Sequence, residues 1–400
     1  MMKSIILTLN DRAEGVTADG TRVPRALPGE EITLSKENQF KIVLPSKDRI
    51  TPVCTHYKSC GGCSIQHVTQ SFIKEWKSNV IKSCLSARGI ETIIKPILTS
   101  EINSRRRVTL HGMKTKKSVT VGFFKKNTHE LISTPSCELV DPEILSAFSL
   151  FEEITLLGAT RKSIIEISVT VSKVGLDLNI LNGKKLENQS IMKITALCEN
   201  FNIARITWNE DLLANFLNPT IEFQGIAITP PPNAFLQATE EGQEILIENA
   251  MLSVFNSDKV IDLFSGCGTF TLPAAKRSEV LAIDKTKSML SAIEQAWRET
   301  SGLKKVTSRS QDLFKEPVGK EELNSFDSAI IDPPRVGAEA QSRELAQSNI
   351  KRISSVSCNP KTFSRDAKIL VDSGFKLDWV QPIDQFLWSS HIELVAQFSR

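Results

Sequence analysis

The pattern of hydrophobic and polar positions changes character after the run of three prolines that ends at Pro232. Five short apolar segments follow, at 259–264, 279–284, 305–311, 326–332 and 352–358. Helical stretches such as 286–300 and 362–372 lie between them, and such alternation is typical of an α/β fold with a doubly wound parallel sheet. The last two apolar segments, 375–380 and 391–398, have no helix between them. We therefore expect an antiparallel pair at the edge of the sheet.

The pattern before Pro232 predicts two smaller units. Residues 30–34 and 40–44 read as strands of a small β unit. Residues 67–88 carry apolar side chains at helical spacing, and the alternation at 164–171 predicts antiparallel strands. We expect three domains: a small β-barrel-like domain at 1–48, a central α+β domain at 49–230 and an α/β domain at 231–400.

The composition is that of a soluble globular protein with room for several domains. Of 400 residues, 40% are apolar and 24% are charged, and no apolar run reaches membrane-spanning length. The apolar run at 5–9 is too short for a signal peptide, so we expect a cytoplasmic monomer without a membrane partner. In a reducing compartment the eight cysteines indicate metal or catalytic thiols rather than a disulfide framework.

The segment 102–129 is basic. It contains no acid and eight cations, namely Arg105, Arg106, Arg107, Lys114, Lys116, Lys117, Lys125 and Lys126. Such clusters bind phosphate backbones through counterion release, and Phe123 and Phe124 would add a stacking surface. A solvated hairpin face is the alternative. We expect contact with nucleic acid here.

A glycine loop follows the first strand of the C-terminal unit. In 260–270 a strand passes through Gly266 and Gly268 into a helix start, where backbone N–H groups can approach a ligand. A dinucleotide site would have a third glycine. Asp284 ends the next strand, where it can accept from ribose hydroxyls, and Asp312 follows the third, in reach of an adenine amine. A lone acid there is more often a helix cap, but the ordered series favours S-adenosylmethionine over NAD.

Three further residues lie at strand ends of the same unit or next to them. Cys358 stands before Asn359-Pro360, which we interpret as blocking a helix, and is a candidate nucleophile, with a buried structural cysteine as the alternative. Asp332 closes the fourth strand, because two prolines prevent its continuation, and would face the substrate. Glu393 lies in an alternating segment, so by pattern alone it reads equally well as a solvent-facing strand residue.

Four ordered motifs resemble those of the RNA uracil-C5 methyltransferase family. They are Asp262-Leu263-Phe264-Ser265-Gly266-Cys267-Gly268-Thr269, Asp332-Pro333-Pro334-Arg335-Val336-Gly337, Ser357-Cys358-Asn359-Pro360-Lys361 and His391-Ile392-Glu393. The resemblance implies a Rossmann-like class I S-adenosylmethionine-dependent methyltransferase domain. It also implies that Cys358 attacks C6 of uracil and that Glu393 removes the C5 proton.

The chemistry explains why a thiol and a carboxylate are needed. Uracil C5 is a poor nucleophile, and thiolate addition at C6 makes an enolate that can take a methyl group from a sulfonium. The remaining C5 proton must leave before the thiolate is expelled, so a base is required. A stacked base cannot reach such a pocket, and we expect a flipped uridine. The resemblance further implies cofactor contacts by Phe264, Asp284 and Asp332, and a cofactor or uracil contact by Gln237.

The spacing of Cys54, Cys60 and Cys63 predicts a metal centre, with Cys137 as the fourth ligand. Four thiolates suit zinc and [4Fe-4S] equally. The Cys-Gly-Gly-Cys pattern resembles the iron–sulfur site of the family's 23S rRNA branch and is absent from its tRNA branch. That resemblance favours [4Fe-4S] and 23S rRNA, in unfolded or partly assembled large-subunit RNA. Cys84, Cys198 and Cys267 match no ligand position, and we interpret them as structural.

The resemblance weakens at two places. Residues 19–30 look like the end of a TRAM domain, after a short preceding segment. Residues 386–390 depart from the family's usual Phe-Pro-His-Thr before the base. Three rivals remain: a tRNA uracil-C5 methyltransferase, a catalytically silent metal-stapled RNA-binding protein, and a methyltransferase that uses no thiol.

Overall fold

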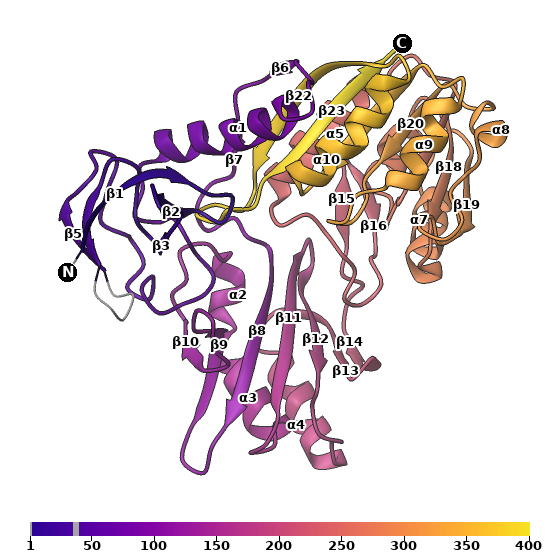
Figure 1. Ribbon diagram of the computed structural model, residues 1–400. Coiled ribbons are helices and arrows are strands. Elements are labelled where there is room, and N and C mark those ends of the chain that lie inside the picture. Colours follow the sequence, from indigo (N-terminus) through magenta and orange to yellow (C-terminus); the bar gives the residue numbers. More distant parts are fainter. Residues whose placement is uncertain (1, 35–39) are drawn as a thin grey trace.

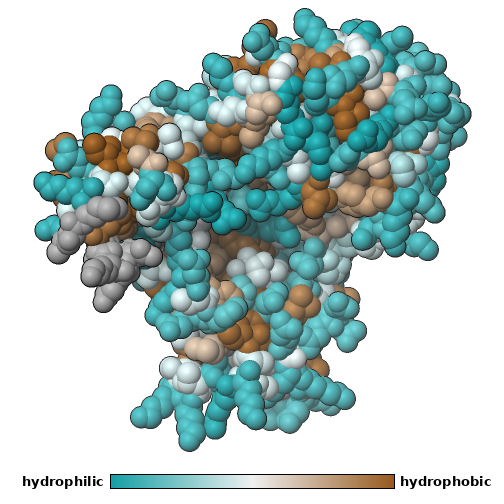
Figure 2. All heavy atoms as spheres, in the orientation of Figure 1, coloured by the Kyte–Doolittle hydropathy of each residue, from teal (hydrophilic) through white to brown (hydrophobic). Residues whose placement is uncertain are grey.

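The computed structural model describes residues 2–34 and 40–400 of the chain. Its strands form sheets of five, seven, two and nine strands, arranged as three bodies in Figure 1. No helix in the described ranges is long and apolar enough to cross a membrane. Figure 2 shows hydrophobic side chains over parts of the N-terminal sheet and hydrophilic ones over the tip of the central unit.

The N-terminal sheet is antiparallel, with strand order β3-β2-β1-β4-β5. Its strands are β1 (Met2–Leu9), β2 (Glu14–Thr17), β3 (Arg22–Pro24), β4 (Glu31–Leu34) and β5 (Phe40–Leu44). Ile6, Val23 and Ile32 form its small core. Because that core is small, polar contacts matter more here. Buried Glu30 accepts two hydrogen bonds from Arg49, at 2.5 and 2.8 Å, which fastens the sheet to the following segment.

The central sheet has seven strands in the order β10-β9-β8-β11-β12-β13-β14. They are β8 (Arg107–Lys114), β9 (Val119–Phe124), β10 (Leu131–Ser133), β11 (Ile164–Ser172), β12 (Gly175–Leu181), β13 (Ile203–Trp208) and β14 (Asp211–Asn215). Three helices accompany them, namely α2 (Pro142–Ser146), α3 (Phe148–Gly158) and α4 (Asn188–Cys198). The alternation predicted for 164–171 is confirmed, since Ile165, Ile167 and Val169 are buried in a core that includes Phe151 of α3.

The C-terminal sheet has nine strands, with the main order β19-β18-β17-β20-β21-β23-β22-β6. They are β17 (Lys259–Leu263), β18 (Glu279–Asp284), β19 (Val306–Ser310), β20 (Ser328–Ile331), β21 (Arg352–Ser357), β22 (Lys376–Asp384) and β23 (Glu393–Ser399), with β6 (Ile93–Ile94) and β7 (Leu98–Thr99) beside β22. β17 to β21 are parallel, and β23 is antiparallel to β21 and β22. The expected doubly wound sheet with an antiparallel pair is confirmed.

Helices cover both faces of this sheet, as Figure 1 shows. They are α5 (Glu240–Val254), α6 (Thr271–Ala274) and α7 (Lys287–Glu299) on one side, and α8 (Lys320–Leu323), α9 (Glu339–Gln347) and α10 (Pro360–Asp372) on the other. The hairpin of β15 (Ile221–Phe223) and β16 (Ile226–Ile228) packs into the first core.

One helix of the expected central domain packs on the C-terminal unit. In α1 (Gln70–Ser86), Ile81 and Leu85 share a core with Phe363 and Leu370 of α10. The helix has an apolar face that must be buried, and α10 offers the partner surface. The domain boundaries at 48 and 230 stay predictions, and the structure adds that α1, β6 and β7 belong to the layers around the nine-stranded sheet.

Candidate active site

Parallel pairing brings the predicted site residues to one edge of the nine-stranded sheet. Leu263 is opposite Ile283 and Ile331, so the residues that follow these strands lie together. Phe264, Asp284 and Asp332 stand at those positions. β23 runs in the opposite direction and pairs Leu394 with Ser357, which places Glu393 and Cys358 beside each other at the same edge.

The glycine loop is shaped by positive φ angles. Phe264, Gly266 and Gly268 have φ values of 62°, 54° and 89°, and a non-glycine residue in this region stores strain that is typical of functional sites. Asp284 accepts from the N–H of Gly266 at 3.1 Å and of Thr286 at 2.8 Å. Asp284 therefore holds the loop in place and keeps further lone pairs for a ligand.

Phe264 and the segment after β19 form an aromatic wall beside this loop. The ring centroids of Phe264 and Phe314 are 5.3 Å apart, and the ring planes are tilted by 51°, within the range of favourable aromatic contacts. Asp312 accepts from the N–H of Phe314 at 3.1 Å. In the structure Asp312 acts as a cap of its own turn, which is the ordinary role of an acid at a strand end.

Three ionisable groups at this edge, Asp332, Glu393 and Cys358, have raised pKa values. Burial raises the pKa of Asp332 to about 7. Burial, and then the charge of Asp332, raise the pKa of Glu393 from 4.5 to about 8. Burial, followed by the charges of Glu393 and Asp332, raises the pKa of the Cys358 thiol to about 12. A group of buried acids of this kind disfavours further negative charge and favours a cationic ligand.

Glu393 and Cys358 differ in exposure in a way that suits their predicted roles. Glu393 is only 4% exposed, so the interpretation as a solvent-facing strand residue is wrong. Its strand is covered on both faces, which the alternation in the sequence does not reveal. Cys358 is half-buried and carries a free thiol, so the alternative of a fully buried structural cysteine is also wrong.

Gln385, which the sequence did not single out, connects two predicted site residues. Its side-chain N–H groups reach Gln237 Oε1 at 2.6 Å and Glu393 Oε2 at 3.2 Å, and its Oε1 accepts from the N–H of Ala238 at 2.9 Å. No motif marks Gln385. In the structure it directly follows β22, which is longer than the strand predicted at 375–380.

Asn359 and Pro360 begin a helix rather than block one. Asn359 is the N-cap of α10, its Oδ1 accepts from the N–H of Lys361, and Pro360 occupies the first turn. Proline is well tolerated there because the first N–H groups of a helix have no helical partner. The prediction that this pair blocks a helix was therefore wrong. Proline disrupts a helix in its interior, whereas Pro360 lies in the first turn.

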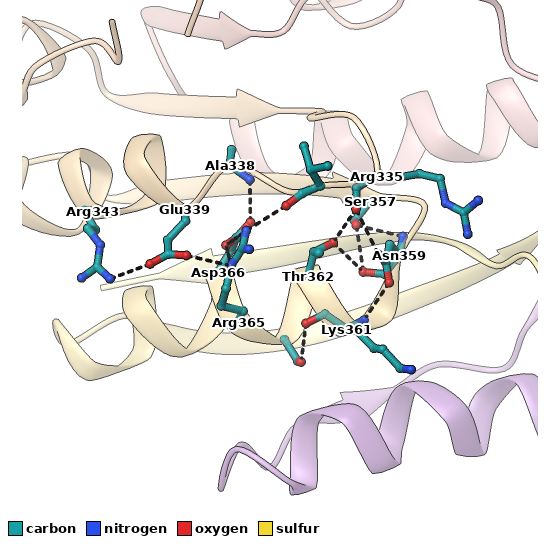
Figure 3. Close-up of polar contacts among 12 residues, drawn as sticks. Arg335, Ala338, Glu339, Arg343, Ser357, Asn359, Lys361, Thr362, Arg365 and Asp366 are labelled. Carbon is teal, nitrogen blue, oxygen red and sulfur yellow. Dashed lines mark hydrogen bonds and ion pairs between the residues drawn. The ribbon is translucent and has the colours of Figure 1, made fainter. Parts of the chain in front are cut away.

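The start of α10 also fixes the loop after Asp332, as Figure 3 shows. Asn359 Nδ2 and Thr362 Oγ1 donate to the carbonyl of Arg335 at 3.0 and 3.1 Å. The carboxylate of Asp366 accepts from the N–H of Ala338 at 2.7 Å. Gly337 lies between them with φ of 74°, and a Cβ atom there would stand 2.5 Å from Asp366. Cys358 and Asp332 are thus held by one docked loop.

The four predicted metal ligands lie in one neighbourhood. Cys54, Cys60, Cys63 and Cys137 are free and half-buried. Burial, together with the smaller effect of the charges of the other three thiols, raises the pKa of Cys63 to about 12. Across residues 2–34 and 40–400, however, no group of three or more Cys, His, Asp or Glu side chains is arranged to hold a metal ion. The donor chemistry suits a thiolate-bound metal, and the ligand set stays a prediction.

The basic segment divides into an internal and an external part. Arg106 is 6% exposed and donates to Gln243 Oε1 at 2.6 Å and to the carbonyl of Gln237 at 3.3 Å. It braces the fold next to the site, so it does not belong to a surface patch. Lys116 and Lys117 are exposed at the turn between β8 and β9. The expected cluster of eight surface cations is therefore wrong for Arg106.

The fold and this edge of the sheet define a Rossmann-like methyltransferase with appended β domains. The chain belongs to the tRNA (Uracil-5-)-methyltransferase family, whose model matches residues 177–399.

Similar proteins match over nearly the whole chain. An uncharacterized RNA methyltransferase from Mesorhizobium japonicum is 37% identical over 94% of this chain and 91% of its own. The 23S rRNA (uracil(1939)-C(5))-methyltransferase RlmD of Burkholderia cenocepacia is 30% identical over 94% of this chain and 89% of its own. A solved Pyrococcus abyssi tRNA (uracil-54, C5)-methyltransferase, in complex with S-adenosyl-L-homocysteine, has the same fold, with a TM-score of 0.78, 23% identity and 99% coverage of both chains.

Proposed function

We propose that this protein methylates C5 of a uridine in RNA, with S-adenosylmethionine as methyl donor and 23S rRNA as the target. The observation that carries the proposal is the meeting of Cys358, Glu393 and Asp332 at the edge that also holds the glycine loop. A thiol that can add to C6 and a carboxyl that can take the C5 proton are the two groups this reaction requires.

The carboxyl groups of Asp332 and Glu393 support a positively charged sulfonium cofactor. When bound, S-adenosylmethionine supplies an electrophilic methyl group on a positively charged sulfur. Burial raises the pKa of Asp332, and burial together with the charge of Asp332 raises the pKa of Glu393. A cation beside them lowers both pKa values and makes their charged forms easier to reach. Asp284 and Phe264 lie at the glycine loop, where they would hold the adenosyl part.

Cys358 and Glu393 carry the two halves of the reaction. The thiol gives up its proton to solvent, its sulfur bonds to C6, and the electron pair of the C5–C6 double bond moves into an enolate that makes C5 nucleophilic. After methylation Glu393 takes the proton of C5, and the electrons return to expel the sulfur of Cys358. Burial and the charges of Glu393 and Asp332 raise the pKa of Cys358, and the positive charge of the bound cofactor would lower that pKa and favour the thiolate.

Two observations support 23S rRNA as the target. A relative that matches 94% of this chain and 89% of its own length, at 30% identity, is named as a 23S rRNA methyltransferase. The four cysteines suit a [4Fe-4S] cluster, which we propose is held by Cys54, Cys60, Cys63 and Cys137, with zinc as the alternative. A tRNA target is the second candidate, because the family description and the Pyrococcus abyssi protein name tRNA.

Mass mapping of 23S rRNA and tRNA from cells with and without the gene tests the target. Loss of one methyl group from a uridine in 23S rRNA supports the proposal and identifies the site. Loss in tRNA alone moves the protein to the second candidate, and an unchanged pattern overturns the enzymatic proposal. Iron, acid-labile sulfide and zinc measured in protein purified without oxygen test the cluster, with Cys60→Ser as the depleted variant and Cys84→Ser as its control.

A further inference from the structure

Gln385 is a buried amide at the end of β22, with every side-chain polar atom engaged. It is 2% exposed. Its three hydrogen bonds reach Ala238 on one side and both Gln237 and Glu393 on the other. A buried side chain that touches two site residues, and lies on neither of their strands, is placed to control how these two residues are oriented.

The backbone N–H of Ala238 fixes the orientation of the whole network. A backbone N–H can only donate, so the atom of Gln385 that faces it must be the carbonyl oxygen. The amino group of Gln385 then faces Glu393 and Gln237, and Gln237 must present its own carbonyl oxygen. The amino group of Gln237 is left to donate elsewhere, and in the described part of the chain it has no hydrogen-bond acceptor. Gln237 therefore offers a donor to an oxygen of a ligand.

The loop that carries this network is anchored by segments far away in the sequence. The ammonium of Lys77 in α1 binds Asp384 at 2.6 Å and donates to the carbonyl of His391 at 2.9 Å. The N–H groups of Ser64 and Ile65 donate to the carbonyl of Trp388 at 2.8 and 3.1 Å. The loop between β22 and β23 is thus fixed from outside the nine-stranded sheet.

We propose that Gln385 is a positioning residue that holds the base Glu393 and turns the amino group of Gln237 toward a ligand oxygen, on a loop anchored by Lys77, Ser64 and Ile65. The inference rests on the proposed function. The oxygen has two candidate sources, a carbonyl of the target uracil and the carboxylate of S-adenosylmethionine.

The hydrogen bond from Gln385 also favours the charged form of Glu393. It lowers the pKa of Glu393 against the opposing effects of burial and of Asp332. Cys358 is the other titratable group that faces this carboxyl. Removal of the donor therefore raises the pKa of Glu393 further. Because proton removal requires the carboxylate, the rise of kcat with pH then moves to higher pH.

Steady-state kinetics on the full-length protein test the inference, with Gln385→Met and Gln385→Glu as variants. Methionine removes all three hydrogen bonds at similar volume. Glutamate keeps an acceptor for Ala238 and loses the donors. Gln381→Met is the matched control, because Gln381 is a buried glutamine of the same strand that donates to the carbonyls of Pro96 and Pro382. Measurements of kcat, both KM values and the pH profile are made on RNA transcripts and S-adenosylmethionine.

We expect kcat to fall about 10²-fold in both Gln385 variants, as for a misplaced catalytic group, with the pH profile moved to higher pH. We expect the control to keep the wild-type profile. A raised KM for RNA identifies a uracil oxygen, and a raised KM for S-adenosylmethionine identifies its carboxylate. A Gln385→Met enzyme with wild-type kcat and pH profile, or a control with the same defects, overturns the inference. A wild-type protein that methylates no RNA refutes the proposed function instead.

Discussion

Sequence motifs predicted two sites: the sheet edge with Asp332, Cys358 and Glu393, called here the catalytic edge, and the loop with Cys54, Cys60 and Cys63, called the cysteine loop. The two sites are ordered in different ways in the structure. At the catalytic edge, Cys358 and Glu393 come from adjacent strands whose register fixes their separation. The four cysteines predicted as ligands lie on turns and loops, and within residues 2–34 and 40–400 no close metal-binding group forms. A sheet holds side chains in place through its hydrogen-bonded ladder, whereas loop ligands gain much of their order from the metal.

The comparison separates predicted sites whose side chains are positioned by the folded chain from predicted sites whose side chains need a bound ligand to take up their final geometry. The catalytic groups are positioned by the folded chain itself, down to the bond from Gln385 to Glu393. The four cysteines share a neighbourhood, and burial raises the pKa values of Cys60, Cys63 and Cys137, whose thiols would lose their protons on binding a metal. Perturbations should therefore affect chemistry at the edge and local order at the loop.

Cys358→Ala should have the largest effect, because without the sulfur C5 stays non-nucleophilic. We expect methyl transfer to fall by about 10⁴-fold or more, as in other enzymes that lose a nucleophile. Transfer of labelled methyl groups from S-adenosylmethionine to RNA measures it, with Cys84→Ala as the control. Turnover near the wild-type value in Cys358→Ala would establish a thiol-independent mechanism.

Glu393→Gln should slow turnover by about 10²- to 10⁴-fold, the range of general-base contributions. Addition and methylation remain available in this variant while proton removal does not, so a covalent RNA–protein adduct should accumulate. Denaturing gels with labelled RNA detect the adduct, and the double variant Cys358→Ala with Glu393→Gln should lack it. Normal turnover without adduct would assign the base to another residue.

Lys77→Met should destabilise the protein more than any other change in α1. It would leave Asp384 buried and unpaired, since both side chains of this ion pair are 0% exposed, and breaking such a pair costs about 3–5 kcal/mol. Urea unfolding measures the loss. Lys74→Met, on the exposed side of the same helix, should be near neutral. Equal stability of the two variants would remove Lys77 as the anchor of the loop.

Stability should fall as pH rises, because Asp332 and Glu393 have raised pKa values, about 7 and about 8, in the folded state. The folded protein binds protons that the unfolded chain has already released, so this contribution is full below about pH 4 and is lost through the folded pKa values. The urea midpoint should decrease from acidic to mildly alkaline pH. Asp332→Asn with Glu393→Gln should flatten that slope, and an unchanged slope would contradict the assignment.

Cys60→Ser should have the smallest effect on chemistry. The backbone beside it contacts the central sheet, with Gly61 N–H donating to the carbonyl of Phe124 at 3.0 Å. We expect weaker RNA binding or lower stability, with single-turnover rates on saturating RNA within about threefold of wild type, the scale of an exposed hydrogen bond. A selective loss of methyl transfer with normal RNA binding would show that the loop acts directly on catalysis.

Much of the site could be predicted because it lies at strand ends that the apolar pattern marks. Asp284 and Asp332 are found where the alternation of strands and helices puts them. Gln385 could not be predicted, because its role depends on the pairing of β22 with β23 and on the approach of Ala238. Arg106 was misplaced for the same reason, since a local run of cations does not show which of them a neighbouring segment buries.

The sequence by itself determined the order of strands and helices and the glycine loop, because periodicity and turn chemistry are local properties, and its resemblance to the family's motifs pointed to Cys358 and Glu393. The tertiary structure alone decided that α1 and β6 attach to the nine-stranded sheet, that Glu393 is buried, and that Lys77, Ser64 and Ile65 fasten the loop before the base. These contacts join residues up to about three hundred positions apart, so they depend on strand register and packing, which no local pattern encodes.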